Sequence, residues 1–285
     1  MFSKSVLVGA LALLGAPSMA AAQSASLHGF TDVSFKNDYI TPRGLVVTSD
    51  GETVQALDGL VLDLPQSPGG LVTDVSFVGG TWTDWNPGFN AQRNKEAFNE
   101  FDWFVGANAK LGKDWTAGVQ YVEFISPQQA FTDEHNVEFS LAFDDSAYMK
   151  TVSFKPYAKL FYEVSGDSTV VLGKHGGTFD VELGVAPSLD LHPYNVPIVL
   201  SAPTWVTLGP QSFWGGGGNT GVFSTGVKAT YALTGVPAAA GHWSVYGAYQ
   251  YYNLVNDRLV DAEQLLNGRS ERNLNLFSVG VGMGF

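Results

Sequence analysis

The sequence contains no cysteine, so neither a disulfide framework nor thiolate metal chemistry is available to it. Charged residues are also scarce: they make up 15% of the 285 residues, and 27 acidic residues face only 15 basic ones. An acidic chain lacks the electrostatic attraction to phosphate on which nucleic-acid binding depends. These shortages exclude disulfide-stabilised scaffolds and argue against nucleic acid as a partner.

Long apolar runs are missing beyond the N-terminus, so no later segment predicts a membrane-spanning helix. The opening MFSKSVLVGALALLGAPSMAAAQS has an early Lys4, an apolar run over residues 6–16 and then small residues. That order is typical of a secretory signal peptide. Ala20 and Ala22 fit the small-x-small rule, and cleavage after a neighbouring residue fits almost equally well. We predict a signal peptide over residues 1–22 and one domain over residues 23–285.

Apolar residues are distributed through this predicted domain in alternation with small or polar ones. Successive side chains of a strand point to opposite faces, so such a pattern gives one apolar face and one polar face. The clearest segments are residues 100–111, 115–121, 136–143, 154–164, 179–186 and 242–251. Each has about the length that a tilted strand needs to cross the hydrocarbon layer. Together with 33 glycines and 13% aromatic residues, they favour a transmembrane β-barrel.

Less regular segments complete the expected strand set. We expect the first strand to start near residue 26 and to continue past Pro42 to about residue 49. The second, TVQALDGLVLDL, predicts a bulge because Asp58 and Asp63 have opposite parity. Further strands lie near residues 72–84, 197–208, 221–233 and the C-terminus. The total is about twelve, within a range of ten to fourteen.

Short and long connections alternate along the chain. This alternation assigns the short turns to the periplasm and the long loops to the exterior of a Gram-negative cell. Lipid also requires ring closure, since no backbone polar group can stay unpaired in hydrocarbon. We therefore predict an all-β, antiparallel transmembrane barrel in the outer membrane, exported through the periplasm, with lipid and lipopolysaccharide as its surroundings.

The chain ends on NLFSVGVGMGF, in which apolar side chains alternate with small ones up to the last residue. The alternating set is Phe277, Val279, Val281, Met283 and Phe285. A final strand that ends in an aromatic residue resembles the sorting signal by which the barrel-assembly machinery recognises outer-membrane barrels. That machinery is therefore an expected partner.

Two N-terminal segments resemble the TorF-type porins, an uncharacterised group of outer-membrane barrels. FTDVSFKNDYITPRGLVV carries an aspartate-tyrosine pair before an arginine-glycine pair, and NEFDWFVGA is similar to a later Glu-x-Asp strand; the matching positions are Asp38, Tyr39, Arg43, Gly44, Glu100 and Asp102. Pro42 departs from the hydrophobic-aromatic filling expected there. The resemblance covers about the first 120 residues and implies a barrel of porin type. It makes Arg43 a candidate for cargo contact, with a packing or inter-strand charge role as the alternative.

Charged residues fall on the face of the strands opposite the aliphatic residues. The inward set is Asp32, Lys36, Asp74, Glu100, Asp102, Glu138, Lys155, Lys159, Glu163, Asp180, Glu182 and Lys228. A hydrated lumen accommodates charges that would be costly on the lipid face. The set predicts a narrow, mildly cation-favouring channel for passive diffusion of small hydrophilic solutes. The alternative is a plugged structural or anchoring barrel, filled by salt bridges around Tyr157, Phe161 and Tyr246.

A lipid-modifying enzyme is the remaining alternative, because such barrels place serine and histidine side by side on the outer wall. We single out His242 and Ser244, which have that spacing within one strand and inward parity. A lumenal hydrogen bond is the better interpretation of this pair. We therefore predict no catalytic residue, no cofactor and no metal site.

Overall fold

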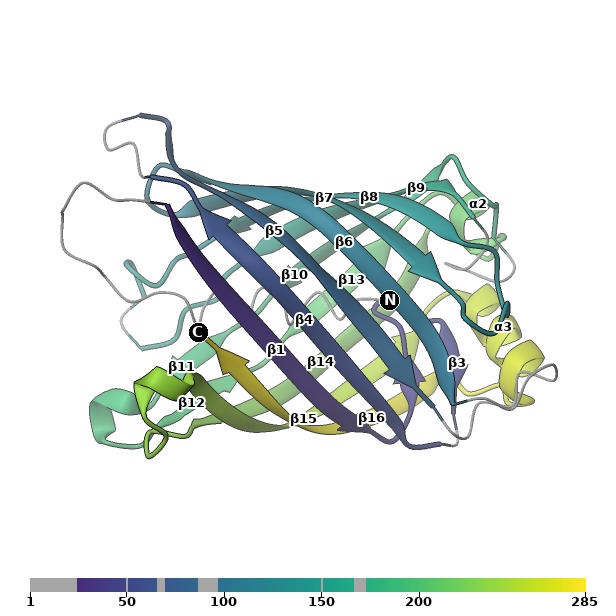
Figure 1. Cartoon of the computed structure of the whole chain (residues 1–285). Coiled ribbons are helices and arrows are strands. Elements are labelled where there is room, and N and C mark those ends of the chain that lie inside the picture. Colours follow the sequence, from purple (N-terminus) through teal and green to yellow (C-terminus); the bar gives the residue numbers. More distant parts are fainter. Residues whose placement is uncertain (1–24, 50, 66–69, 87–96, 150, 167–172) are drawn as a thin grey trace.

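The computed structural model describes residues 25–49, 51–65, 70–86, 97–149, 151–166 and 173–285, and it shows an antiparallel β-barrel (Figure 1). The wall consists of β1 (Ser26–Lys36), β4 (Thr53–Asp63), β5 (Val72–Trp85), β6 (Phe98–Leu111), β7 (Trp115–Ile125), β8 (Glu134–Phe143), β9 (Tyr157–Ser165), β10 (Thr178–Val185) continued by β11 (Ser188–Asp190), β12 (Ile198–Ser201) continued by β13 (Thr204–Leu208), β14 (Thr220–Ala232), β15 (His242–Leu254) and β16 (Asn273–Gly284). Each strand pairs with its neighbours, and β1 pairs with β16 to close the ring. The prediction of a closed barrel of twelve strands is confirmed. The predicted signal peptide lies outside the described residues.

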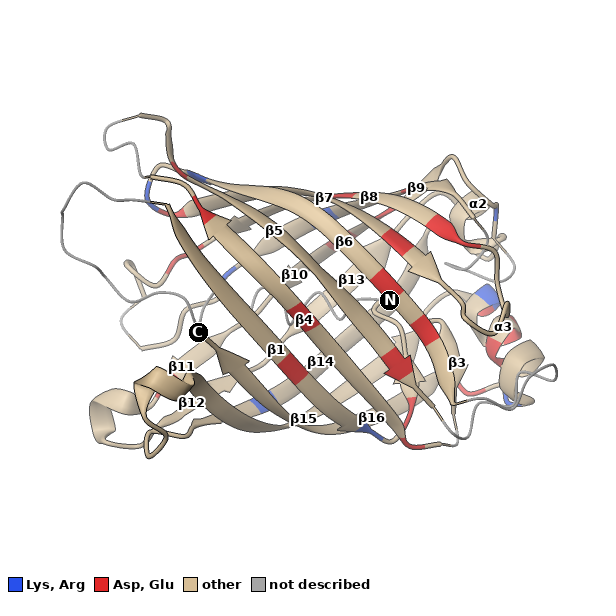
Figure 2. Cartoon of the chain, in the orientation of Figure 1, with Lys and Arg blue, Asp and Glu red and all other residues tan. Residues whose placement is uncertain are grey.

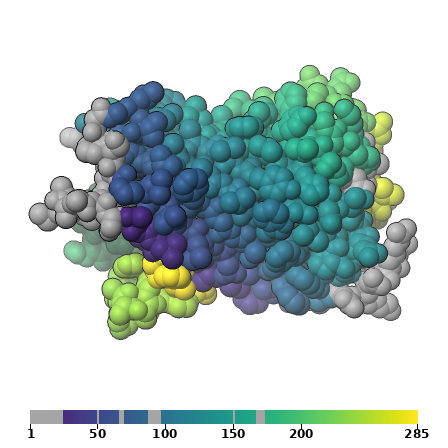
Figure 3. Space-filling view, turned by 45° about the horizontal axis from the view of Figure 1, so that its top comes forward, coloured from purple at the N-terminus to yellow at the C-terminus, as the bar shows by residue number. Residues whose placement is uncertain are grey.

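The two faces of the wall differ in the way the alternation predicts. Outward side chains are aliphatic or aromatic and well exposed, among them Val105, Val119, Phe139, Val227 and Val279. Figure 3 shows this outer surface over strands in the first half of the chain. Polar and charged side chains point inward, where a carboxylate avoids the cost of contact with hydrocarbon. Among the described residues, no helix is long and apolar enough to cross a membrane.

The barrel has a turn end and a loop end. Short connections, the start of β1 and the end of β16 lie at the turn end, which also carries the 3₁₀ turns η1 (His192–Tyr194) and η2 (Ala238–Ala240). The loop end carries α2 (Gln211–Trp214) and α3 (Asp257–Asn267). Asn256 caps α3 by accepting a hydrogen bond from the Arg258 amide, and Gly268 ends it in a left-handed conformation. The helix buries Leu259 and Ala262 toward the barrel mouth.

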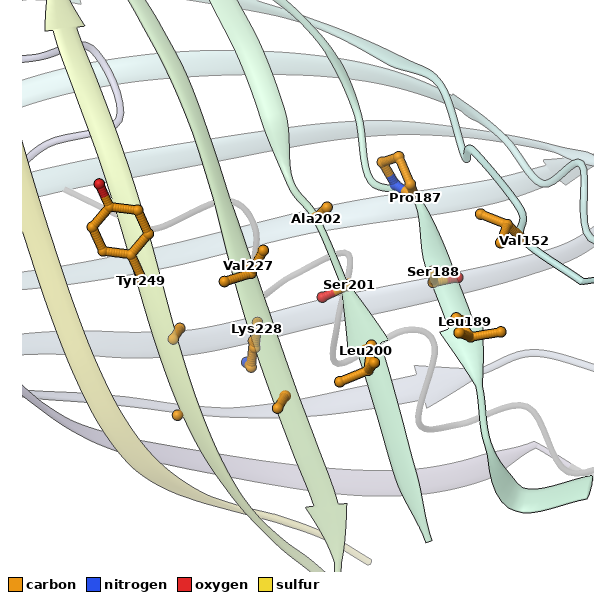
Figure 4. Close-up of a pocket in the computed structure, with 13 residues that line it drawn as sticks. Val152, Pro187, Ser188, Leu189, Leu200, Ser201, Ala202, Val227, Lys228 and Tyr249 are labelled. Carbon is orange, nitrogen blue, oxygen red and sulfur yellow. The ribbon is translucent and has the colours of Figure 1, made fainter. Parts of the chain in front are cut away.

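Prolines interrupt two neighbouring strands near the turn end. Pro187 separates β10 from β11, and Pro203 separates β12 from β13, because proline supplies no amide to a ladder. A cavity of about 510 Å³ lies at this break, lined by apolar side chains that include Val152, Leu200 and Val227 (Figure 4). Leu200 and Val227 belong to the exposed outer face. These two side chains place part of the hollow on the outward face of the wall, while Lys228 of the inner face also lines it.

The final residue helps to close the ring. Phe285 and Gly29 exchange two backbone hydrogen bonds of 3.0 Å, and the phenyl ring lies over Gly29 so closely that a Cβ there would come within 2.1 Å of a ring carbon. Phe277, Val279 and Val281 point outward. This arrangement gives the C-terminal pattern a structural role; its recognition by the assembly machinery stays a prediction.

Two expectations about the first strands are wrong. β1 ends at Lys36, and the chain then enters the barrel as a short hairpin of β2 (Tyr39–Ile40) and β3 (Val46–Thr48) instead of continuing as wall. β4 pairs with β1 and β5 in continuous register, so the predicted bulge is absent. Asp58 instead faces outward, directly opposite Thr31 and Thr81 on the neighbouring strands.

A prediction follows for the closing contact. Gly29→Ala forces the Phe285 ring away and should lower the unfolding free energy in detergent micelles by about 1 kcal/mol, the usual worth of such aromatic packing. Phe285→Ala should cost a similar amount, and the double variant should cost no more than either single change. Gly247→Ala is the control, since a Cβ there meets no atom within 4 Å. Additive losses in urea unfolding would show that the two residues do not interact.

Candidate functional site: a lumen crossed by an inner loop

The inner loop, defined here as residues 37–49, folds into the lumen from the loop end. Its tip is a tight turn in which the Thr41 amide donates to the Leu45 carbonyl and the Leu45 amide donates to the Thr41 hydroxyl. Gly44 has a φ of 87°, a conformation that strains residues with a side chain. Leu254, Leu259 and Val222 would also lie about 3 Å from a Cβ at this position. Glycine after Arg43 is therefore required by both conformation and space.

Arg43 fixes the tip of the inner loop to the opposite wall. Its Nε donates to Asp180 Oδ1 at 2.5 Å, and its Nη2 lies 3.8 Å from Glu138 Oε1. The guanidinium carbon stands 3.3 Å from the centroid of the Phe161 ring. The Arg43 side chain is 2% exposed. A charge this deeply buried is tolerated only with such compensation, so these contacts decide where the loop can lie.

Other parts of the inner loop bind to different elements. Trp205 Nε1 donates to the Pro42 carbonyl at 3.0 Å, and the Tyr39 hydroxyl donates to Glu100 Oε2 at 2.8 Å. Asn267, at the end of α3, donates to the Val46 carbonyl at 2.9 Å. The inner loop is thus bonded to its surroundings near its start at Tyr39, at its tip at Pro42, and after the tip at Val46. These bonds give it a defined position within the lumen.

The predicted inward residues form separate groups around the inner loop. Glu138, Asp180 and Glu100 contact the loop, and Lys159 Nζ lies 3.4 Å from Glu182 Oε1. Asp32 accepts a hydrogen bond of 2.8 Å from the Tyr246 hydroxyl, and Lys228 Nζ lies 3.7 Å from the centroid of the Tyr246 ring.

Three further members lie apart from these groups. Lys36 donates a hydrogen bond to Gln55, and Glu163 accepts one from the Gly176 amide. Asp74 lies directly opposite Lys110. Asp102 is buried on β6, directly opposite Phe124 of β7.

Lys155 is the exception in this set. It precedes β9, in the connection from β8, with a left-handed φ of 48°, and its amide donates to Asp145 Oδ1 at 3.0 Å. The alternation in its neighbourhood suggested a strand, but Pro156 at the next position interrupts the ladder. Lys155 therefore lies in the connection between β8 and β9, outside the wall.

Sequence reasoning missed three inward carboxylates on the described strands, Asp63, Asp84 and Glu134. Asp63 has the inward parity of Gln55 and Leu57 on β4, and its Oδ2 lies 3.1 Å from His28 Nε2 at the turn end.

Asp84 accepts hydrogen bonds from Thr53, Gln55 and Asn99, and Glu134 begins β8. Asp84 and Asp74 are both even-numbered positions of β5, so the alternation that placed Asp74 inward could also have placed Asp84 inward. Glu134 has the parity of Glu138 but sits at a strand start that looked like loop.

Ser26 Oγ lies 3.1 Å from His28 Nε2 within β1, a serine–histidine pair that sequence reasoning passed over. Asp63 Oδ2 lies 3.1 Å from the same nitrogen, whereas a catalytic triad needs the carboxylate on the other ring nitrogen.

The other serine–histidine pairs are not in hydrogen-bond contact among the described residues. Ser244 is buried on the inner face and His242 is exposed at the start of β15, without a hydrogen bond between them. On the outer wall, Ser165 lies directly opposite His135 across two strands, a pairing that a search within one strand could not find. His135 Nδ1 is 2.6 Å from the Tyr121 hydroxyl, which gives this ring a structural partner.

Comparison with known proteins rests on structure alone. No protein-family model matches the chain, and no curated protein sequence matches it. The chain is similar to the crystal structure of an outer membrane channel from Pseudomonas putida F1, with a TM-score of 0.52, 9% sequence identity, and coverage of 93% of this chain and 97% of that chain. The fold is that of an outer-membrane β-barrel.

Other barrels resemble the chain less. Outer membrane phospholipase A from Escherichia coli gives a TM-score of 0.44 with 14% identity, covering 90% of this chain and 92% of that one. The KdgM porin gives 0.42 with 8% identity, covering 90% and 99%. Neither likeness is close enough to transfer a site. The TorF-type resemblance stays a prediction.

The Arg43–Asp180 contact leads to a stability prediction. Arg43→Gln removes the cation that contacts buried Asp180 and should lower the unfolding free energy by about 3–5 kcal/mol. Adding Asp180→Asn to Arg43→Gln should recover part of that loss, because the buried charge is then removed. Urea unfolding of the detergent-folded protein measures both.

The control for this prediction is Arg258→Gln. Arg258 forms an exposed ion pair of 3.0 Å with Asp261, for which a change below about 1 kcal/mol is expected. An Arg43→Gln variant as stable as the Arg258→Gln variant would contradict the anchoring role of Arg43.

Proposed function

We propose that the protein is an outer-membrane channel for passive diffusion of small hydrophilic solutes, narrowed by the inner loop and mildly cation-favouring. The observation that carries this proposal is the opposition of an apolar outer face and a charged inner face in a closed ring. A plugged barrel filled by salt bridges would pair its interior charges, whereas the described inner face carries more carboxylates than cations. The likeness to an outer membrane channel agrees with the proposal through the fold.

The cation preference rests on the sign of the lumenal charges. Acidic positions follow one another across neighbouring strands (Figure 2). On the described strands the inner-face carboxylates are Asp32, Asp63, Asp74, Asp84, Glu100, Asp102, Glu134, Glu138, Glu163, Asp180 and Glu182, and the cations on the described part of the inner face are Lys36, Arg43, Lys110, Lys159 and Lys228. Ion pairs neutralise part of the acidic set. The surplus favours cations over anions within a narrow pore.

The inner loop makes conductance the decisive measurement. A loop held across the lumen narrows a channel or closes it, and those two states differ in ion flow. We expect purified, folded protein to give discrete current steps in planar bilayers. Silence from folded protein would instead support the plugged structural barrel.

Selectivity is tested with a matched pair of carboxylates. Asp32 faces the lumen on β1, and Asp58 faces outward on the adjacent β4, opposite Thr31. Removal of one charge about 10 Å from an ion in water changes its free energy by about 0.4 kcal/mol. The same change favours chloride by an equal amount, so Asp32→Asn should lower the potassium-to-chloride permeability ratio about fourfold.

Asp58→Asn is the control and should leave that ratio unchanged. Reversal potentials in asymmetric potassium chloride measure both variants. A wild-type potential that favours chloride would refute the cation preference while leaving the channel itself intact.

A further inference from the structure

Lys228, on the inner face of β14, is held by an aromatic ring instead of a carboxylate. Its Nζ lies 3.7 Å from the centroid of the Tyr246 ring, and among the described residues the ammonium forms neither a hydrogen bond nor an ion pair. The side chain is only partly buried. An ammonium that rests on an aromatic face keeps its hydrogen-bond donors available to a solute.

Asp32 lies at the edge of the same ring. Its Oδ1 accepts the hydrogen bond of 2.8 Å from the Tyr246 hydroxyl. Asp32 and Lys228 are close enough to attract each other, yet they do not form an ion pair, which would bring the charged atoms within about 4 Å. Tyr246 takes the lysine on its face and the aspartate at its hydroxyl. The ring therefore keeps two opposite charges apart on the wall of the lumen.

Glycines of β16 form the floor beside this ring. A Cβ at Gly280 would come within 2.3 Å of a carbon of the Tyr246 ring, so the ring lies directly over that glycine. A Cβ at Gly282 would lie 3.4 Å from Asp32 Oδ2 and 3.3 Å from Ser244 Oγ. These two oxygens therefore border the same glycine, and within the described part of the chain neither has a hydrogen-bond partner.

The Tyr246 site is defined here as Asp32, Lys228, Ser244 and Tyr246. The next lysine along β1, Lys36, belongs to a neighbouring group. It donates to Gln55, whose amide donates to Asp84 at 3.1 Å.

The charges that act on the Tyr246 site are balanced. Lys36 is attracted by Asp84 and, more weakly, by Asp32, and it repels Lys228. Among the described residues, two lysines thus face two aspartates. A solute that carries one positive and one negative charge matches this arrangement better than a simple anion or cation.

We propose that the Tyr246 site binds small α-amino acids as zwitterions, with the carboxylate at Lys228 and the ammonium at Asp32 Oδ2 and Ser244 Oγ. The two charged groups of an α-amino acid are attached to one carbon atom, and each makes a charge-assisted hydrogen bond of about 2.8 Å. Such a solute bridges a gap that is too wide for the ion pair. The inference rests on the proposed channel function and names a class of solute, since solute reaches the Tyr246 site through the lumen.

The first experiment is a saturation-transfer NMR titration of the detergent-folded protein with L-alanine. Saturable binding is expected. Propionate and ethylamine carry one charge each and should bind about tenfold more weakly, the loss expected for one charge-assisted contact. In 5-aminopentanoate the two charges lie at opposite ends of a chain, so it should also bind more weakly than L-alanine. Equal binding of propionate and L-alanine would indicate a simple anion site and overturn the proposal.

Two variants test the assignment of each charge. Lys228→Met keeps the methylene chain and removes the ammonium, and Asp32→Asn removes the carboxylate. Each should weaken L-alanine binding about tenfold. Unfolding temperatures of both variants establish that they are folded. Binding that is unchanged in both folded variants would overturn the site.

The matched controls are Lys110→Met and Asp74→Asn. These residues lie directly opposite each other on β6 and β5, near the turn end. Neither change should alter L-alanine binding more than twofold. An equal loss in Lys110→Met and Lys228→Met would show that L-alanine responds only to the total charge of the lumen, which also overturns the site.

The second experiment separates the site from the channel. Liposomes that contain the protein should swell in L-alanine at a rate that saturates with concentration, and Lys228→Met should shift this saturation to about tenfold higher concentration. Binding without swelling would reject the channel and retain the site. Swelling without binding would reject the site and retain the channel.

Discussion

The absence of water in hydrocarbon is the constraint on which this structure depends. Every backbone amide in the wall needs a partner, so the strands close into a ring and β1 must find β16. Closure then separates an outer face, which is apolar, from an inner face, which can hold charge. The carboxylates and lysines of the lumen are consequences of that separation. The backbone hydrogen bonds between Phe285 and Gly29 extend this closure at the turn end, where the last strand pairs with the first.

The wall was predictable because its signal is local. Alternation with period two fixes both the existence of a strand and the direction of each side chain, so eleven of the twelve predicted inward charges lie on wall strands. The register also follows, since a shift by one residue would reverse the faces. Asp58 shows the limit of this reasoning. We expected a bulge because Asp58 and Asp63 have opposite parity, but β4 pairs continuously with both neighbours and leaves Asp58 outward between two threonines.

The inner loop could not be predicted from its own residues. Residues 37–49 contain Ile40, Val46 and Val47, which suit a strand continuing from β1. What draws them into the lumen is a set of distant partners, since Arg43 meets Asp180 137 positions later and Pro42 meets Trp205 163 positions later. The resemblance to TorF-type porins singled out Arg43 and left open whether it contacts cargo or packs. The contacts of its guanidinium favour the packing role.

The path of the inner loop also affects the shape of the barrel. The loop leaves the wall between β1 and β4, yet its tip is bonded to β10 and β13, which lie far around the ring. It therefore joins wall segments on opposite sides of the cross-section, as a strut does in a tube. A ring of paired strands resists stretching along its circumference but flattens easily, because flattening breaks no ladder bond. A strut across the diameter opposes that flattening, so the inner loop would preserve a rounded cross-section against lateral pressure from the bilayer.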